Sequence, residues 1–103
     1  MNLSLLLWGI PQAMRAAARI YPGYAQRLKE RDLVAQIKMR DEPDVGRWIQ
    51  LDGGRVKTGG GIHSDPDVTI AFKNAALAKS FLVPPFDMLE RIDAAKNFKL
   101  LLE

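Results

Sequence analysis

The sequence contains no cysteine and a single histidine, His63. The absence of cysteine excludes disulfides, thiolate nucleophiles and cysteine-ligated metal sites. It is typical of a chain that works in a reducing compartment, so we expect a cytoplasmic protein. No apolar run approaches the ~20 residues that a membrane-spanning helix needs. Internal repeats and low-complexity tracts are also missing, which leaves a small globular protein as the class to consider.

The composition, with 103 residues of which 48% are apolar and 26% charged, is that of one folded domain. We expect a single domain over residues 1–103, with a helical N-terminal segment at 1–32 and a core at 33–103. The net charge of +3 comes entirely from the first segment, which carries five basic and two acidic residues. An excess this small is typical of a solvated helix face. The alternative is peripheral contact with an anionic membrane, and the lack of aromatic residues between the basic ones argues against nucleic acid. The basic residues are Arg15, Arg19, Arg27, Lys29 and Arg31.

The N-terminal segment has two helical stretches separated by a breaker. Pro11 suits the first turn of a helix, and residues 12–20 are rich in alanine and arginine, which favour helix. Residues 21–24 contain Pro and Gly and interrupt it, and a short helix over 25–31 is expected to follow. The apolar stretch 1–10 is predicted to be a helix or strap that packs on another apolar surface.

The core segment changes to a period of two, which indicates strands. Asp52-Gly53-Gly54 predicts a hairpin turn, because glycine tolerates the positive φ of such turns. Asn74 and Asp87 are predicted N-caps of helices over 75–82 and 88–95. The fold class is therefore α+β, with a five-stranded, mostly antiparallel sheet and helices packed on one face. The strands are predicted over 33–39, 48–51, 55–58, 68–72 and 98–102.

The order of these elements, together with Trp48 in the second strand, the Asp52-Gly53-Gly54 turn and the strand at 66–72, resembles the sterol carrier protein (nonspecific lipid-transfer) domain family. The resemblance covers residues 33–103. It implies a role in lipid transport, with an apolar tunnel between sheet and helices that holds a fatty acyl chain, acyl-CoA or sterol. Family members usually continue beyond the fifth strand through a segment that closes the tunnel. Because this chain ends at Glu103, we expect a fragment or one module of a larger protein.

The predicted ligand-binding residues come from the fourth strand and the two helices that follow it. The same residue types also build ordinary cores, so the sequence leaves both interpretations open. We expect binding of a lipid or other apolar molecule, without catalysis and without a cofactor. The alternative is a non-catalytic interaction domain that docks a larger protein partner or forms a homo-oligomer. The predicted ligand-binding residues are Phe72, Leu77, Phe81, Phe86, Met88, Leu89 and Ile92.

Two other patterns contain residue types that can carry chemistry. His63, Asp65 and Asp67 offer nitrogen and oxygen ligands to a metal, but Asp65-Pro66-Asp67 is also an ordinary turn, and no metal site is expected. The glycines at 53–54 and 59–61 lack the phosphate-loop order, because Lys57-Thr58 precedes the glycines and a strand follows them. No serine is placed beside His63 with an orienting acid, so no catalytic residues are predicted.

Overall fold

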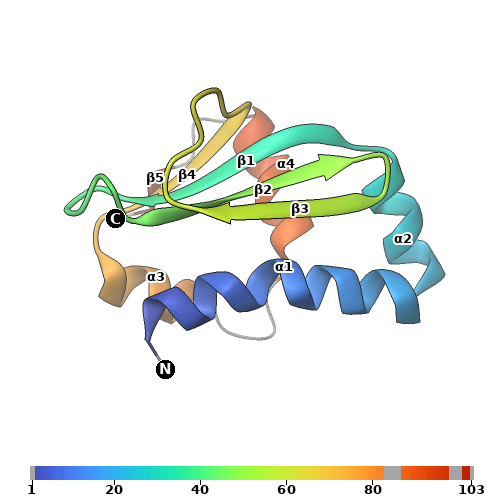
Figure 1. The fold of residues 1–103 in the computed structure, drawn as a ribbon, viewed down its shortest axis with the longest axis horizontal. Helices are drawn as coiled ribbons and strands as arrows, with labels where there is room; N and C mark the ends of the chain where they lie inside the picture. Colours follow the sequence, from blue (N-terminus) through green and yellow to red (C-terminus); the bar gives the residue numbers. More distant parts are fainter. Residues whose placement is uncertain (1, 83–86, 98–100, 103) are drawn as a thin grey trace.

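The computed structural model describes residues 2–82, 87–97 and 101–102, and Figure 1 shows their arrangement. Helices and a sheet are both present, with α1 and α3 below the strands in Figure 1, so the predicted α+β class is confirmed. The elements in chain order are α1 (Leu3–Ile20), α2 (Pro22–Lys29), β1 (Asp32–Met39), β2 (Gly46–Asp52), β3 (Arg55–Gly60), β4 (Val68–Phe72), α3 (Ala75–Phe81), α4 (Met88–Asn97) and β5 (Leu101–Leu102).

The sheet is mixed, with the order β3-β2-β1-β4 for its four full strands and the two-residue β5 beside β4. β2 pairs antiparallel with β1 and β3, whereas β4 pairs parallel with β1 and with β5. The prediction of a five-stranded, mostly antiparallel sheet was therefore wrong, because the sheet is mixed and has four full strands. The physical reason is the connection after β3, which returns across the sheet and places β4 on the far side of β1. Of the predicted strand at 98–102, residues 98–100 lie outside the described residues.

The β2–β3 hairpin turns at Gly53 and Gly54, whose φ values of 58° and 102° confirm the predicted role of glycine there. β3 lies at the sheet edge and extends two residues further than predicted, to Gly60. Gly59 of β3 faces the Trp48 indole. A Cβ added at position 59 would lie 2.6 Å from that ring, so only glycine fits there without a shift. The close packing of these two residues explains why glycine continues a strand here.

Helix α1 is continuous through Pro11, although the sequence predicted that a helix would start there. Its true start is capped by Asn2, whose side chain accepts a hydrogen bond from the Leu5 amide at 2.8 Å. An internal proline costs a helix ~3 kcal/mol. The helix persists because Leu7, Ile10, Pro11 and Met14 form a buried face against the rest of the protein, and tertiary packing outweighs that cost.

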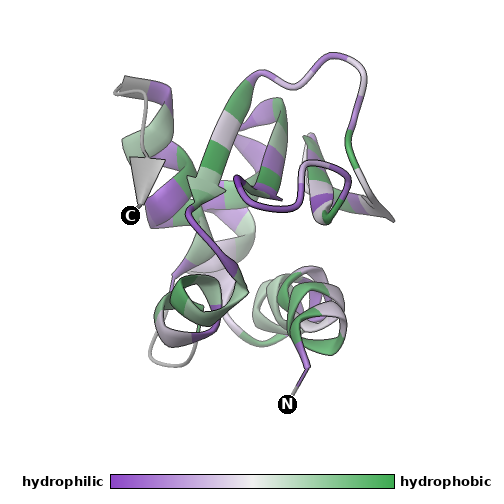
Figure 2. Ribbon diagram, turned by 90° about the vertical axis from the view of Figure 1, so that its left-hand side faces the viewer, coloured by the Kyte–Doolittle hydropathy of each residue, from purple (hydrophilic) through white to green (hydrophobic). Residues whose placement is uncertain are grey.

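The core lies between the sheet and the helices, as Figure 2 shows with α1 and α3 side by side below the strands. Alternate residues of each strand face the helices, and in β1 these are Leu33, Ala35, Ile37 and Met39. The predicted caps Asn74 and Asp87 are confirmed by hydrogen bonds from the amides that follow them. No helix in the described ranges is long and apolar enough to cross a membrane.

On the face of the sheet that points away from the core, β1 carries a buried polar residue, Gln36. Its Oε1 accepts a hydrogen bond from the His63 amide at 2.7 Å. Its Nε2 donates to the carbonyls of Ile37 at 2.8 Å and Gly61 at 2.9 Å. These bonds tie Gly61 and His63, in the connection between β3 and β4, to the middle of β1.

Candidate apolar binding site

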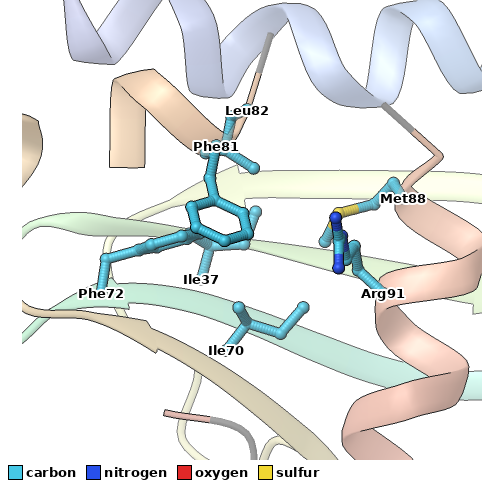
Figure 3. A pocket seen from close by; sticks show the side chains of 7 residues that line it. All are labelled: Ile37, Ile70, Phe72, Phe81, Leu82, Met88 and Arg91. Carbon is cyan, nitrogen blue, oxygen red and sulfur yellow. The ribbon is translucent and has the colours of Figure 1, made fainter. Parts of the chain in front are cut away.

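The predicted ligand-binding residues gather between β4, α3 and α4, but they leave almost no space. Phe72, Phe81 and Met88 surround a void of about 10 Å³ together with Ile37, Ile70, Leu82 and Arg91, as Figure 3 shows. A void of this size holds at most about one water molecule. Leu89 and Ile92 are fully buried beside it, and Leu77 packs against the same cluster. Phe86 lies outside the described residues.

The wall of this void combines aromatic and cationic contacts. The Phe72 and Phe81 rings lie 6.1 Å apart at an interplanar angle of 53°. The Arg91 guanidinium lies 5.4 Å from the centre of the Phe81 ring, a cation–π distance. Phe81 is partly exposed, so the void sits close to the surface beneath one aromatic ring.

A much larger concavity lies next to this void, between α1, α2 and the adjoining ends of α3 and α4. Its volume is about 630 Å³, which is within the range of sites for small organic ligands. Almost all of its wall is apolar, and α1 contributes most of it. The lining residues are Leu5, Leu6, Trp8, Gly9, Ile10, Ala13, Met14, Ala17, Tyr21, Tyr24, Leu82, Asp87 and Met88. We refer to this concavity as the α1 groove.

The α1 groove exists because small residues recur at every fourth position of the helix. Gly9, Ala13 and Ala17 lie on one side of α1, since residues four apart share a helix face. At one end of the groove Leu5 and Trp8 are 52% and 51% exposed, which is unusual for side chains of this size and apolarity. Sequence analysis missed this surface, although the spacing of the small residues was its signal.

The α1 groove and the small void share a wall. Leu82 and Met88 line both of them. Methionine is flexible and adapts its packing to its surroundings. Among the described residues of the predicted ligand-binding set, Met88 is the one that reaches the α1 groove.

The end of the α1 groove nearest to α2 is polar. Burial and the nearby Asp87 carboxylate raise the pKa of Tyr24 to about 12. Arg27 pairs with Asp87 at 3.1 Å and lies 5.7 Å from the centre of the Tyr24 ring. The groove therefore has an apolar length and one end at which hydroxyl, carboxylate and guanidinium groups meet.

The structure uses His63, Asp65 and Asp67 in local hydrogen bonds. The His63 Nδ1 accepts from the Asp65 amide at 3.0 Å, and its ring packs edge-on against Trp48 at 5.2 Å. An Asp67 carboxylate oxygen accepts from the Val34 amide at 2.7 Å, where β1 and β4 meet. Over residues 2–82, 87–97 and 101–102, no three His, Cys, Asp or Glu side chains are grouped as metal ligands.

Comparison with known proteins adds no relative. No family model, no curated protein and no solved structure matches this chain. Nothing in these comparisons identifies a sterol carrier protein domain. The geometry of the α1 groove and the residues that line it are the features that indicate a binding site.

Proposed function

We propose that this chain binds an apolar molecule, such as a fatty acyl chain, acyl-CoA or sterol, non-covalently in the α1 groove. The observation that carries the proposal is the volume of about 630 Å³ with an almost wholly apolar wall. Concave, mostly apolar sites of a few hundred Å³ with a few polar groups are typical places for small organic ligands to bind. We propose a sterol-carrier-like function for this fold. The proposed ligand lies along α1, whereas the resemblance implies a site between the sheet and the helices.

Burial alone supplies enough free energy for such binding. Each methylene removed from water contributes about 0.8 kcal/mol, so ten buried methylenes contribute about 8 kcal/mol before the cost of association. Covering the exposed side chains of Leu5 and Trp8 with a ligand contributes further binding free energy in the same way. The proposed mechanism is thus sequestration, which needs no cofactor and makes no covalent bond.

The polar end of the α1 groove supports one orientation of an amphipathic ligand. Tyr24 keeps its proton over the whole neutral range, because its pKa is about 12, and so presents a hydroxyl donor. The Arg27 guanidinium beside it is neutralised in part by Asp87. We place the polar head of the ligand at this end and its apolar chain toward Leu5 and Trp8.

The test is binding of a fluorescent fatty acid to the purified chain. Ala13→Glu introduces a carboxylate into the wall of the α1 groove and is expected to weaken binding at least tenfold, because the charge would lose its water when the ligand binds. Ala76→Glu, at an exposed position of α3 outside the groove, is the matched control. Absence of binding by the folded wild-type chain, or equal affinity in both variants, would exclude this function.

A second candidate function is self-association through the same surface. The four-residue spacing of Gly9, Ala13 and Ala17 lets the backbone of another helix approach closely, and Leu5 and Trp8 flank that spacing. The candidate occupant is α1 of a second copy of the chain. Native mass spectrometry separates the two functions, since a lipid adduct on a monomer supports the first and a ligand-free dimer lost on Ala13→Glu supports the second.

A further inference from the structure

A second hollow lies on the other side of α1, between this helix, α2 and the edge strand β3. Its volume is about 520 Å³. Three small residues, Ala18, Ala25 and Gly54, leave the space open. Four basic residues also line it, Arg15 and Arg19 from α1 and Arg55 and Lys57 from β3, and no acidic residue of the described ranges does. We refer to it as the basic hollow.

Arg15 is held in place within the basic hollow. Its Nε and Nη2 donate to the Val56 carbonyl at 3.1 and 2.6 Å, and its Nη1 donates to Gln12 at 3.2 Å. A guanidinium has five N–H donors, so these three bonds orient the group and leave donors for a ligand. An oriented guanidinium loses less entropy on binding an anion than a free one does.

The other basic side chains of the basic hollow differ in whether they form an ion pair. Arg19 and Arg55 are exposed and make no ion pair with any described residue. Lys57 lies 3.6 Å from Asp52, a contact between two half-exposed groups that contributes little in water. The Lys29 side chain crosses Gly54 at the rim and adds a further positive charge.

The other basic residues of the N-terminal segment are neutralised elsewhere. Arg27 pairs with Asp87, and Arg31 pairs with Asp93 on α4. The five basic residues that the sequence placed together are therefore divided by the fold. Arg15 and Arg19 join Arg55 and Lys57 across the gap between α1 and β3, and this arrangement brings four basic side chains to one concavity.

We propose that the basic hollow binds a phosphate group. Arginine N–H donors match the oxygens of phosphate, and several cations around one concavity raise the local concentration of anions. The phosphate belongs either to a small phosphorylated molecule or to a lipid headgroup, and both present the same oxygens. This site does not depend on the proposed function, because it lies on a different side of α1 from the apolar groove.

The experiment uses the full chain with two probes, inorganic pyrophosphate followed by amide chemical shifts and phosphatidylglycerol vesicles followed by co-sedimentation. Arg19→Glu/Arg55→Glu reverses two exposed charges of the hollow. Lys73→Glu/Lys79→Glu reverses two exposed charges elsewhere and gives the same net charge. The first variant is expected to bind about tenfold more weakly than the wild type and the second nearly as well.

Each outcome bears on the proposal. Pyrophosphate binding that only the hollow variant loses supports a small phosphorylated ligand, and vesicle binding with the same pattern and no pyrophosphate binding supports a lipid headgroup. Phosphatidylcholine vesicles, which have no net charge, are the control for apolar adsorption. If neither probe binds the wild type, or if both variants weaken binding equally, the basic hollow is not a phosphate site.

Discussion

The Arg31 guanidinium binds the Asp93 carboxylate through two parallel hydrogen bonds, Nε to Oδ1 at 2.9 Å and Nη2 to Oδ2 at 2.5 Å. Arg31 follows α2 and Asp93 lies on α4, so the pair joins segments 62 residues apart. A further hydrogen bond from Arg31 to the Arg27 carbonyl fixes the guanidinium to the end of α2. This relationship sets the position of α2, and with it the polar end of the α1 groove.

Removing the charge of this pair should destabilise the fold measurably. We expect Asp93→Asn to lower the free energy of unfolding by about 1 kcal/mol at neutral pH, because a two-bond pair of this kind is stronger than an ordinary surface ion pair. Urea denaturation of the variant measures the change. Asp44→Asn, at an exposed loop position, is expected to be neutral.

The Arg31–Asp93 pair also predicts that the free energy of unfolding falls at acidic pH. The hydrogen bond from Arg31 holds the pKa of the Asp93 carboxyl below its usual range, against the opposing effect of burial. A carboxyl whose pKa is lower in the folded state stabilises the fold above its unfolded pKa of about 3.9 and loses that contribution as the pH falls through the folded value. The difference between wild type and Asp93→Asn should therefore shrink below pH ~4. A difference that stays constant to the lowest measurable pH would contradict this assignment.

Gly46 is predicted to be the glycine least tolerant of a side chain. A Cβ at this position would lie 2.3 Å from the Ile37 carbonyl oxygen, which belongs to the backbone of the neighbouring strand and cannot move aside. Gly46→Ala should therefore cost about 2–3 kcal/mol of stability. Gly23 in α2 has nothing within 4 Å of an added Cβ, so Gly23→Ala should be neutral or stabilise by about 0.5–1 kcal/mol. Thermal unfolding of both variants tests the contrast, and equal melting temperatures would refute it.

Gln36 is predicted to be required for the connection at 61–67. Gln36→Leu keeps the size of the side chain but leaves the His63 amide and the Gly61 carbonyl without their partner, which should cost about 2–3 kcal/mol. Hydrogen exchange at the His63 amide should accelerate in the variant. Gln50→Leu, on the same face of the sheet, is the control, because the Gln50 side chain makes no hydrogen bond with the described residues. Unchanged exchange at His63 in Gln36→Leu would show that the loop is held by other contacts.

The sequence predicted local elements well because their signals are local. The hairpin at Gly53 and Gly54 and the cap at Asn74 depend on residues within four positions of each other, and all are found where the pattern placed them. The extent of α1 could not be predicted from local signals. Pro11 argues for a helix start, and only the buried face that α1 presents to the protein explains its position inside the helix.

The candidate site was harder to predict because core and pocket walls use the same residues. Phe72, Leu89 and Ile92 are apolar and periodic, and the fold uses them to fill the space between β4 and α4. The open surface lies where the side chains are small, at Gly9, Ala13 and Ala17. The parallel pairing of β4 with β1 could not be predicted from the sequence either, because it depends on the path of residues 61–67 across the sheet.

Tyr24 should make the stability of the fold depend on alkaline pH. Burial and the Asp87 carboxylate raise its pKa from 10.0 to about 12 in the folded state. A group whose folded pKa is raised contributes stability that is fully present below the unfolded value and is lost as the pH rises through the folded one. The expected window of loss is therefore pH ~10 to ~12. The lysines titrate in the same range, so the informative quantity is the difference in unfolding free energy between wild type and Tyr24→Phe.

This difference isolates the Tyr24 hydroxyl, because Tyr24→Phe keeps the ring against Arg27 and removes only the ionisable group. We expect the wild type to lose stability relative to Tyr24→Phe as the pH rises across the window, and the late phenolate absorbance to disappear in the variant. Tyr21→Phe, which changes the exposed tyrosine at the junction of α1 and α2, should leave that late titration in place. If Tyr24→Phe and the wild type lose stability in parallel, the hydroxyl is solvated in both states, and the polar end of the α1 groove is open to water.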